Sequence, residues 1–183
     1  MIIGIAGTLG AGKGTVVEYL KKKGFKDYSS SGILKEMLTE RGHPHTREYL
    51  SNVAEELLAT YPGGILSVSL LRAQKDGAEN FILEAIHRMS EAEFVRRIGG
   101  KIVGVDADIR LRYERTLARK EGEKDAVAFE QFSESSARED EGKRHLTSNI
   151  KSVINTADAI IQNNGTLEEL HAQIDTALAQ ITK

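Results

Sequence analysis

The sequence predicts an α/β fold, a three-layer sandwich in which helices cover both faces of a five-stranded parallel sheet. Short apolar runs rich in β-branched residues alternate along the whole chain with longer segments of helical periodicity. These runs lack the polar alternation of a strand with one solvated face, so the strands should be buried on both sides. Strands joined through helices form parallel sheets with right-handed crossovers, and ligands bind at the carboxyl ends of such strands.

The first half of the chain is expected to contain three of the strands. Residues 1–6 are an apolar run that stops at Gly7, and a glycine-rich turn leads into a helix over residues 15–23 that Gly24 closes. Apolar residues then recur at helical spacing on both sides of a Pro-Gly-Gly turn. The other segments of this half are a short strand over 25–28, helices over 33–38, 46–60 and 65–75, and a buried strand over 81–83 that runs into Glu84.

The second half is expected to contain two strands and four helices. Ser90 and Glu93 have the spacing of a capping box, in which a serine and a later glutamate satisfy free amides at a helix start. Thr166 and Glu169 repeat this pattern before the last helix. The other segments are a strand over 101–105 that Asp106 terminates, charged helices over 109–120 and 126–140, and a strand over 159–162.

The composition excludes several classes of protein. The 183 residues fit one domain, residues 1–183, whose core needs no disulfide or metal. Lys and Arg number 25 against 27 Asp and Glu, which argues against a nucleic-acid binder that relies on uncompensated basic charge. The absence of cysteine excludes disulfides, a cysteine nucleophile and thiolate zinc sites. No run approaches the roughly 20 apolar residues of a membrane span and no signal-peptide pattern is present, so we expect a cytoplasmic protein.

A glycine-rich segment between the first strand and the first helix is the strongest indication of a binding site in the sequence. Glycines let backbone amides turn inward around anionic oxygens, the helix N-terminus adds its dipole, and a lysine supplies a mobile cation. The alternative is a turn that only allows close packing. The strict pattern has Ser or Thr directly after the lysine as a Mg²⁺ ligand, whereas Gly14 stands there and the hydroxyl moves to Thr15. The residues expected to bind nucleotide phosphates are Gly7, Leu9, Gly10, Ala11, Gly12, Lys13, Gly14 and Thr15.

The segment from Gly7 to Thr15, which ends Gly-Lys-Gly-Thr, resembles the phosphate loop of the adenylate-kinase-like nucleoside monophosphate kinases. The resemblance covers nearly the whole chain. Phe81–Arg88 is similar to the family's apolar strand, acidic residue and nearby arginine. Three later segments resemble small archaeal and bacterial proteins described as adenylate-kinase-like or dephospho-CoA-kinase-like: Val105–Asp108, Arg112–Arg115 and Asn164–Leu170. The resemblance implies a P-loop NTPase fold of the kinase type, with ATP and Mg²⁺ as cofactors.

Glu84 and Thr15 are the candidates for supporting Mg²⁺. Glu84 ends an apolar strand at the sheet edge, where the resemblance implies an acidic residue that orients Mg²⁺, usually through water. The alternative for Glu84 is a carboxylate at a helix start. Asp106 and Asp108 follow the next strand, and each could orient Mg²⁺ or serve as a carboxylate at a helix start. For Asp108 we expect the second role, as the cap of the following helix.

Arginines supply the remaining cations. Phosphoryl transfer depends on positioning and on compensation of charge at the equatorial oxygens. In the resembled kinases a short helical lid brings arginines to ATP, and residues 115–140 would form it here, with Arg115 and Arg119 on one helix face. The alternative is a solvated, salt-bridged helix pair, because acidic residues are interleaved at Glu114, Glu121, Glu123, Glu139 and Asp140. The residues expected to be catalytic are Lys13, Arg88, Arg115, Arg119 and Arg138.

The binding site for the phosphoryl acceptor is expected in residues 31–75, because the resemblance implies that the helices after the second strand bind this acceptor. The expected acceptor-binding residues are Ser31, Arg47 and Arg88, since guanidinium groups bind phosphate oxygens bidentately. The adenylate-kinase pattern of Thr-Gly followed by an arginine is broken at Ser31–Lys35, and His87 stands where those kinases have a proline. The segment Asn163–Thr166 follows the last strand, where the resemblance implies that the chain passes the donor adenine, and it also fits a turn before a capped helix. Within this segment Asn164 and Gly165 are the residues expected to bind the donor nucleotide.

The expected function is ATP- and Mg²⁺-dependent phosphoryl transfer to a nucleoside monophosphate. Its partners would be small-molecule nucleotides, without nucleic acid or membrane. Two alternatives stay open. Transfer to a hydroxyl, as in dephospho-CoA kinase, would benefit from a carboxylate base such as Asp27 or Glu84. A nucleotide-binding regulatory ATPase would use the same loop, whereas the Asn-Lys-x-Asp run of a guanine switch is missing.

Overall fold

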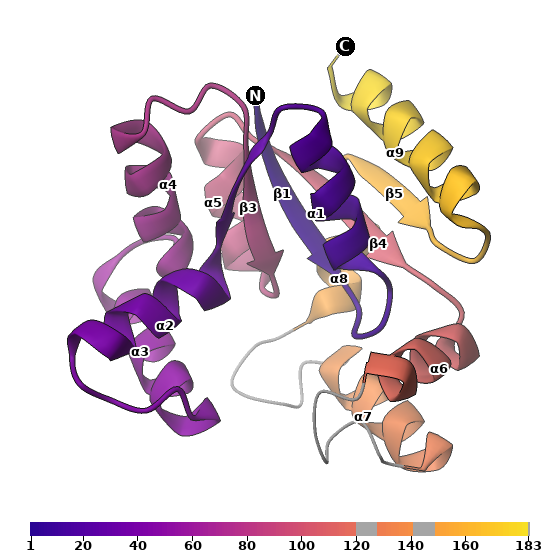
Figure 1. The fold of residues 1–183 in the computed structure, drawn as a ribbon, viewed down its shortest axis with the longest axis horizontal. Helices are drawn as coiled ribbons and strands as arrows, with labels where there is room; N and C mark the ends of the chain where they lie inside the picture. Colours follow the sequence, from indigo (N-terminus) through magenta and orange to yellow (C-terminus); the bar gives the residue numbers. More distant parts are fainter. Residues whose placement is uncertain (120–127, 141–148, 183) are drawn as a thin grey trace.

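The computed structural model describes residues 1–119, 128–140 and 149–182. Within them a five-stranded, all-parallel sheet has the order β2–β3–β1–β4–β5, and helices cover both of its faces (Figure 1). The predicted α/β class is confirmed. The strands are β1 (Ile2–Gly7), β2 (Lys26–Ser29), β3 (Phe81–Ile86), β4 (Lys101–Asp106) and β5 (Ala159–Gln162).

The helices expected from apolar periodicity are present in the described residues, with ends that differ by a few residues. The helices are α1 (Lys13–Lys22), α2 (Ser30–Glu40), α3 (Arg47–Thr60), α4 (Ile65–Lys75), α5 (Met89–Arg97), α6 (Ile109–Arg119), α7 (Phe129–Asp140), α8 (Ile150–Asn155) and α9 (Leu167–Ile181). Helix α8 was not predicted, because six residues are too few to show helical periodicity. Among these helices none is long and apolar enough to cross a membrane.

Apolar side chains on both faces explain why the strands are continuous apolar runs. One face packs against α1 and α9, with Ile5 and Leu20 in that layer. The opposite face packs against α4, α5 and α8, with Leu83 and Val95 between them. A third apolar group, which includes Leu38, joins α2, α3 and α4 beside the edge strand β2. A parallel sheet covered in this way has no solvated face to interrupt its strands with polar residues.

Helix α5 begins with a cap different from the predicted Ser90–Glu93 box. Its N-cap is Arg88, and the buried carboxylate of Glu91 accepts the Arg88 backbone N–H at 3.1 Å. Strand β3 runs on to Ile86, so the helix begins before Ser90 and its third position falls on Glu91. The predicted box is therefore wrong, whereas the box at Thr166–Glu169 is confirmed.

The carboxyl ends of the parallel strands meet at one edge of the sheet. The loop between β1 and α1, the end of β4 and the chain after β5 all lie at this edge, and both chain termini lie at the opposite end (Figure 1). Helices α2 and α3 stand to one side of the edge, and α6 and α7 stand to the other (Figure 1). Residues far apart in the sequence therefore meet at one place.

Candidate nucleotide-binding site

The glycine-rich segment forms a tight loop between β1 and α1 that requires glycine at two positions. Gly10 and Gly12 have φ of 78° and 94°, in the left-handed region that favours glycine. A Cβ at Gly10 would lie 2.3 Å from the Arg112 carbonyl oxygen, and a Cβ at Gly12 would lie 2.3 Å from the Asn163 side-chain nitrogen. The loop therefore lies directly against two distant segments of the chain.

Lys13, the first residue of α1, folds back over this loop. Its Nζ donates hydrogen bonds to the carbonyl oxygens of Gly7 at 2.6 Å and Thr8 at 3.2 Å. An ammonium on a flexible four-carbon stem can exchange these oxygens for those of a phosphate. The next two residues, Gly14 and Thr15, are exposed in the first turn of α1, where backbone N–H groups and the helix dipole favour anions. This arrangement can bind the phosphates of a nucleotide.

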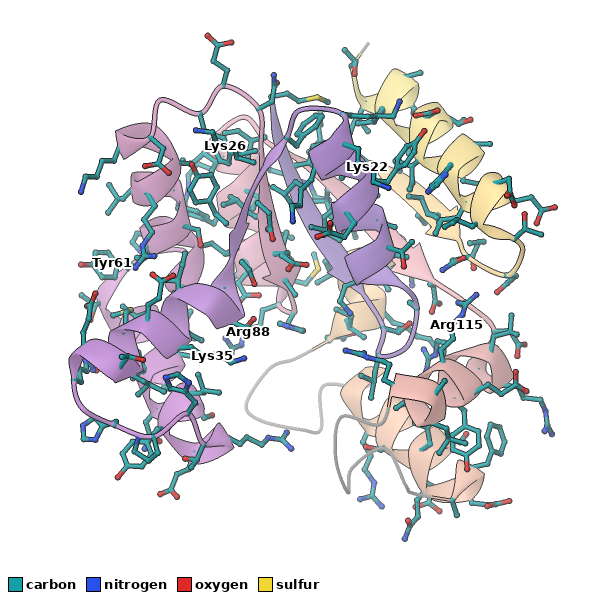
Figure 2. All side chains as sticks on the ribbon, viewed as in Figure 1. Lys22, Lys26, Lys35, Tyr61, Arg88 and Arg115 are labelled. Carbon is teal, nitrogen blue, oxygen red and sulfur yellow. The ribbon has the colours of Figure 1, made fainter. Side chains whose placement is uncertain are left out.

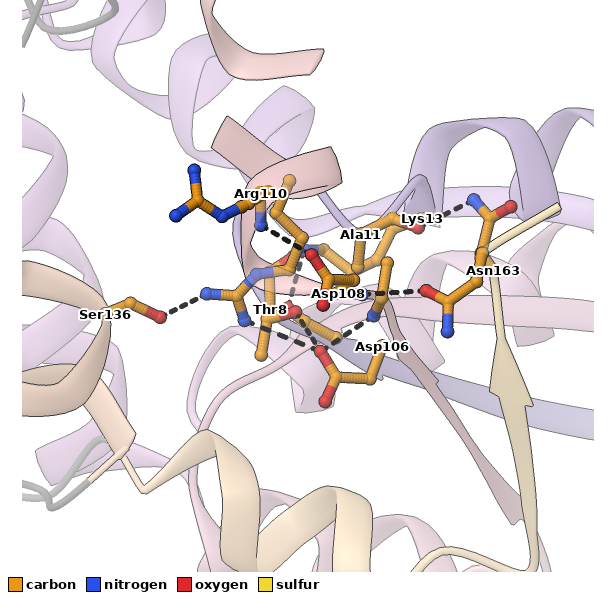
Figure 3. Close-up of polar contacts among 12 residues, drawn as sticks. Thr8, Ala11, Lys13, Asp106, Asp108, Arg110, Ser136 and Asn163 are labelled. Atoms are coloured by element: carbon orange, nitrogen blue, oxygen red, sulfur yellow. Dashed lines mark hydrogen bonds and ion pairs between the residues drawn. The ribbon is translucent and has the colours of Figure 1, made fainter. Parts of the chain in front are cut away.

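Polar side chains from the ends of β4 and β5 and from α6 hold the loop in shape (Figure 3). Asn163, buried directly after β5, donates from Nδ2 to the Ala11 carbonyl at 2.8 Å, and Arg115 donates to the Asn163 carbonyl at 3.0 Å. Thr8 donates from Oγ1 to Oδ1 of Asp106 at 2.7 Å. Donors fixed before a ligand arrives cost less reorganisation when charge must be stabilised.

Asn164 and Gly165, predicted from the sequence to lie near the nucleotide, follow Asn163 directly. Asn164 accepts the Asp108 backbone N–H at 2.7 Å, and Gly165 lies against the capping box of α9. Asn163, which contacts the loop, is the first residue of this predicted segment, although it was not itself expected to bind the nucleotide. Asp108 caps α6 as predicted, because its carboxylate accepts the Arg110 N–H at 2.8 Å.

Two carboxylates lie toward the same edge of the sheet. Glu84 pairs in register with Ser29 of β2 and Ile5 of β1, and Asp27 lies two residues before Ser29 on the same face. Burial, and then the charge of Asp27, raises the pKa of Glu84, while Lys13 opposes the rise. Burial also raises the pKa of Asp27, whose Oδ1 is buried without a hydrogen-bond partner among the described residues. The candidate metal-supporting group and the candidate phosphate-binding lysine thus interact electrostatically.

Glu84→Gln should raise the melting temperature at neutral pH. Because the pKa of Glu84 is raised in the folded protein, its ionisation costs more there than in the unfolded chain, and this cost appears as pH rises through the raised pKa. The amide removes the cost. Calorimetry should show a higher melting temperature for the variant than for the wild type at pH 7. The difference should disappear below about pH 4, where the Glu84 carboxyl is protonated in both the folded and the unfolded protein. Glu55→Gln, at an exposed site on α3, is the control. An equal or lower melting temperature for Glu84→Gln at pH 7 would contradict this account.

The residues at this edge fit a Mg²⁺ ion that arrives with a nucleotide. Mg²⁺ keeps several waters and binds through one or two carboxylates together with substrate phosphates. Glu84 offers a carboxylate, and Thr15 offers an exposed hydroxyl. Across the described residues there is no group of three or more His, Asp or Glu side chains that could hold a metal ion in the absence of a bound nucleotide.

Two further basic residues follow β3. Arg88 donates from Nη1 to Oε1 of Glu91 at 3.2 Å, and its buried Nε has no hydrogen-bond partner in the described parts of the chain. Loss of hydration, followed by the charges of Lys13 and Arg88, lowers the pKa of His87 to about 4, although the residue as a whole keeps an exposed surface. His87 is therefore neutral at pH 7. Figure 2 shows Arg88 below the end of β3, with Lys35 extending from α2 on the same side of the molecule.

The three arginines predicted in the lid have different surroundings. Arg115 is half-buried beside the loop, where it bonds Asn163. Arg119 is exposed at the end of α6. Arg138 is exposed on α7 and pairs with Glu134 of its own helix at 3.5 Å, as in the alternative of a salt-bridged helix. Parts of the prediction lie outside the described residues: segment 120–127 with Glu121 and Glu123, and the side chains of Glu139 and Asp140.

The predicted acceptor residues come from three separate elements. Ser31 is exposed in the first turn of α2, with its Oγ 3.2 Å from Oγ of Ser29. Arg47 is exposed and begins α3, and Arg88 stands apart at the start of α5. A groove between β2, α2 and α4 is lined by Asp27, Tyr28, Ser29, Gly32, Ile33, Glu36, Arg72, Lys75 and Asp76. The groove and the exposed starts of α2 and α3 offer room for an acceptor on this side.

Comparison with known proteins relates this chain to one domain family and, over nearly its whole length, to two groups of proteins. The family model described as AAA domain matches residues 3–142. A UPF0200 protein of Sulfurisphaera tokodaii is 31% identical, over 98% of this chain and 97% of its own. A dephospho-CoA kinase of Corynebacterium efficiens is 28% identical, over 98% of this chain and 96% of its own.

Solved structures share the fold. TT1252 from Thermus thermophilus superposes with a TM-score of 0.65 at 20% identity, covering 100% of this chain and 98% of that one. The dephospho-CoA kinase from Campylobacter jejuni superposes with a TM-score of 0.58 at 14% identity, covering 98% of this chain and 96% of that one. At such identities the likeness concerns the fold alone.

Proposed function

The chain belongs to the UPF0200 proteins and, through the AAA domain over residues 3–142, to the P-loop kinase-like superfamily, and we propose that it is an ATP- and Mg²⁺-dependent kinase of nucleoside monophosphates. One observation carries the proposal. The loop of residues 7–13 is held in shape by Asn163 and Asp106, and its Lys13 folds back over the carbonyl oxygens of Gly7 and Thr8. The charges of Lys13 and of Arg88 both act on His87, directly after β3, and a cation at the phosphate loop with a guanidinium on this side of the sheet suits a reaction between two phosphate groups.

In the proposed reaction, an oxygen of the acceptor phosphate attacks the γ-phosphorus of ATP. The bond from that phosphorus to the oxygen shared with the β-phosphate breaks, and ADP leaves with the electron pair. An acceptor phosphate is ionised at neutral pH, so its oxygen needs no base. Catalysis then depends on alignment of the two phosphates and on compensation of their negative charge.

We propose the following roles for the side chains. Loop amides and Lys13 hold the β- and γ-phosphates, and Arg88 binds the acceptor phosphate with its guanidinium fork. Mg²⁺, supported by Glu84 and Thr15, would supply further charge compensation between the phosphates when it is bound. The remaining roles are charge compensation from the lid by Arg115, Arg119 and Arg138, acceptor binding by Ser31 and Arg47, and contact with the donor base by Asn164 and Gly165.

Transfer to a hydroxyl is a second candidate, favoured by the buried Oδ1 of Asp27. This oxygen has no hydrogen-bond partner within the described residues, and Asp27 lines the groove between β2, α2 and α4. A carboxylate there could accept the hydroxyl proton while the hydroxyl oxygen attacks phosphorus. Two dephospho-CoA kinases are similar to this chain, so dephospho-CoA is the hydroxyl acceptor to test.

A panel of acceptors tests the proposed function. The purified protein is incubated with ATP, Mg²⁺ and each ribo- or deoxynucleoside monophosphate or dephospho-CoA, and products are separated by chromatography. We expect ADP and a nucleoside diphosphate in equal amounts with at least one monophosphate. Turnover with dephospho-CoA alone would replace the first candidate with the second. Release of phosphate at a rate that no acceptor changes would instead favour the regulatory ATPase.

A further inference from the structure

Arg112 lies in α6, and its side chain has no role in the site as described so far. Its residue is 3% exposed, and its guanidinium joins two separate segments. Nη2 donates to Oγ of Ser136 on α7, and Nη1 lies 3.5 Å from Oδ1 of Asp106 at the end of β4. The same Oδ1 accepts the 2.7 Å hydrogen bond from Thr8 of the loop (Figure 3). A polar chain therefore runs from the phosphate loop through Asp106 and Arg112 to α7.

The backbone of Arg112 contacts the loop as well. A Cβ at Gly10 would lie 2.3 Å from the Arg112 carbonyl oxygen, so the loop tip lies directly on α6. That oxygen also accepts a 2.8 Å hydrogen bond from Thr116, and the guanidinium carbon lies 5.8 Å from the centre of the Phe132 ring on α7. Packing and hydrogen bonding thus join the loop, α6 and α7 at one residue.

Arg112 lies on the same helix as two of the proposed catalytic arginines. Arg115 and Arg119 lie three and seven residues further along α6, which puts all three side chains on one face of the helix. A buried guanidinium that loses one partner is left incompletely paired in a poorly hydrated place. The contacts of Arg112 with Asp106, Ser136 and the loop therefore tie the first turns of α6 to the loop, on the same helix face as Arg115 and Arg119.

We propose that Arg112 is a positioning residue that couples the phosphate loop to α6 and α7, so that a phosphate in the loop sets the place of Arg115 and Arg119. The effect on catalysis rests on the proposed function. The coupling does not, because it requires only that ATP binds the loop. The competing account is that Arg112 is an anchor whose loss lowers stability without changing how the loop and α7 respond to ATP.

Two variants and a matched control separate these accounts. Arg112→Lys keeps the positive charge but cannot bond Asp106 and Ser136 together, since an ammonium lacks the fork. Ser136→Ala removes one partner by a smaller change. Arg110→Lys is the control, because Arg110 is exposed on the same helix and contacts α7 through Phe129, a contact that involves neither Asp106 nor Ser136. Each variant is first shown to be folded by its melting curve.

The first readout is hydrogen exchange with and without ATP, which requires no acceptor. In the wild type and in Arg110→Lys, ATP should slow exchange both in the loop and in α7. In Arg112→Lys and Ser136→Ala, ATP should still protect the loop but should protect α7 much less. Protection of α7 that stays equal in all four proteins, or that is missing from the wild type, would overturn the coupling whether or not the protein is a kinase.

The second readout is the division between kcat and KM with the acceptor found in the panel. A misplaced catalytic group costs rate rather than binding, so Arg112→Lys should lower kcat by about 10- to 100-fold and change KM for ATP little. An unchanged kcat with a lowered melting temperature would support the anchor and overturn the positioning role. If the wild type transfers phosphoryl to no acceptor, the proposed function fails, and the exchange experiment still decides the coupling.

Discussion

Lys13→Ala should lower kcat by about 100- to 1,000-fold, the range seen when one preorganised donor to a developing charge is removed. The ammonium lies at 2.6 Å from the Gly7 carbonyl, on the loop proposed to hold the phosphates. It is the loop's mobile cation, so its loss leaves charge on the γ-phosphoryl oxygens uncompensated as the bond breaks. The loop itself should keep its shape, because the bonds from Asn163 and Thr8 do not involve the lysine side chain.

The measurement is steady-state kinetics with ATP and the acceptor from the panel, alongside circular dichroism melting curves. Lys22→Ala is the matched control, since Lys22 is exposed in the last turn of the same helix and should leave kcat unchanged. A folded Lys13→Ala protein with wild-type turnover would falsify the assignment of the loop to phosphate binding.

The fold could be predicted from local patterns because this sheet is buried on both faces. Each strand is an apolar run, and glycines or capping residues mark most helix ends, so class, strand number and helix order follow without tertiary information. The errors occur where tertiary packing decides. Helix α8 has six residues and is stabilised by buried contacts of Ile150 and Val153 that no local pattern reveals. The capping box of α5 lies at Arg88 and Glu91, and not at Ser90 and Glu93, because β3 continues to Ile86.

The candidate site also contains residues that local patterns predict and residues that only tertiary packing brings together. Residues 7–15 are adjacent in sequence and act as a unit, so their motif is readable, and Glu84 was found because it follows an apolar run, although β3 continues past it to Ile86. Asn163 and Arg112 act on the loop from about 150 and 100 residues away, through Ala11, Gly10 and Asp106. A single asparagine or arginine has no local spacing that distinguishes a loop contact from a surface residue. Such partners become visible only when the sheet order places their strands together.

Arg119→Ala should lower kcat by about 1,000-fold, the lower end of the range for an arginine that compensates charge in phosphoryl transfer. Arg119 lies at the exposed end of α6, on the face shared with Arg115. An arginine that meets the phosphoryl group only as its charge spreads acts in the transition state and not in the ground state. The affinity for ATP should therefore change by less than about 3-fold, since binding energy realised only in the transition state appears in kcat.

Titration calorimetry with ATP and steady-state kinetics separate the two effects, and Arg110→Ala on the same helix is the control. Loss of ATP affinity without loss of kcat at saturation would assign Arg119 to ground-state binding. Equal behaviour of Arg119→Ala and Arg110→Ala would instead support the solvated, salt-bridged helix that the interleaved acidic residues also fit. The two arginines differ in what surrounds them, because Arg110 stacks on Phe129 whereas Arg119 continues the helix face that begins at the buried Arg112. If Arg112 positions that face, the effect of Arg119→Ala should be smaller in an Arg112→Lys background, since an arginine already misplaced has less catalysis to lose.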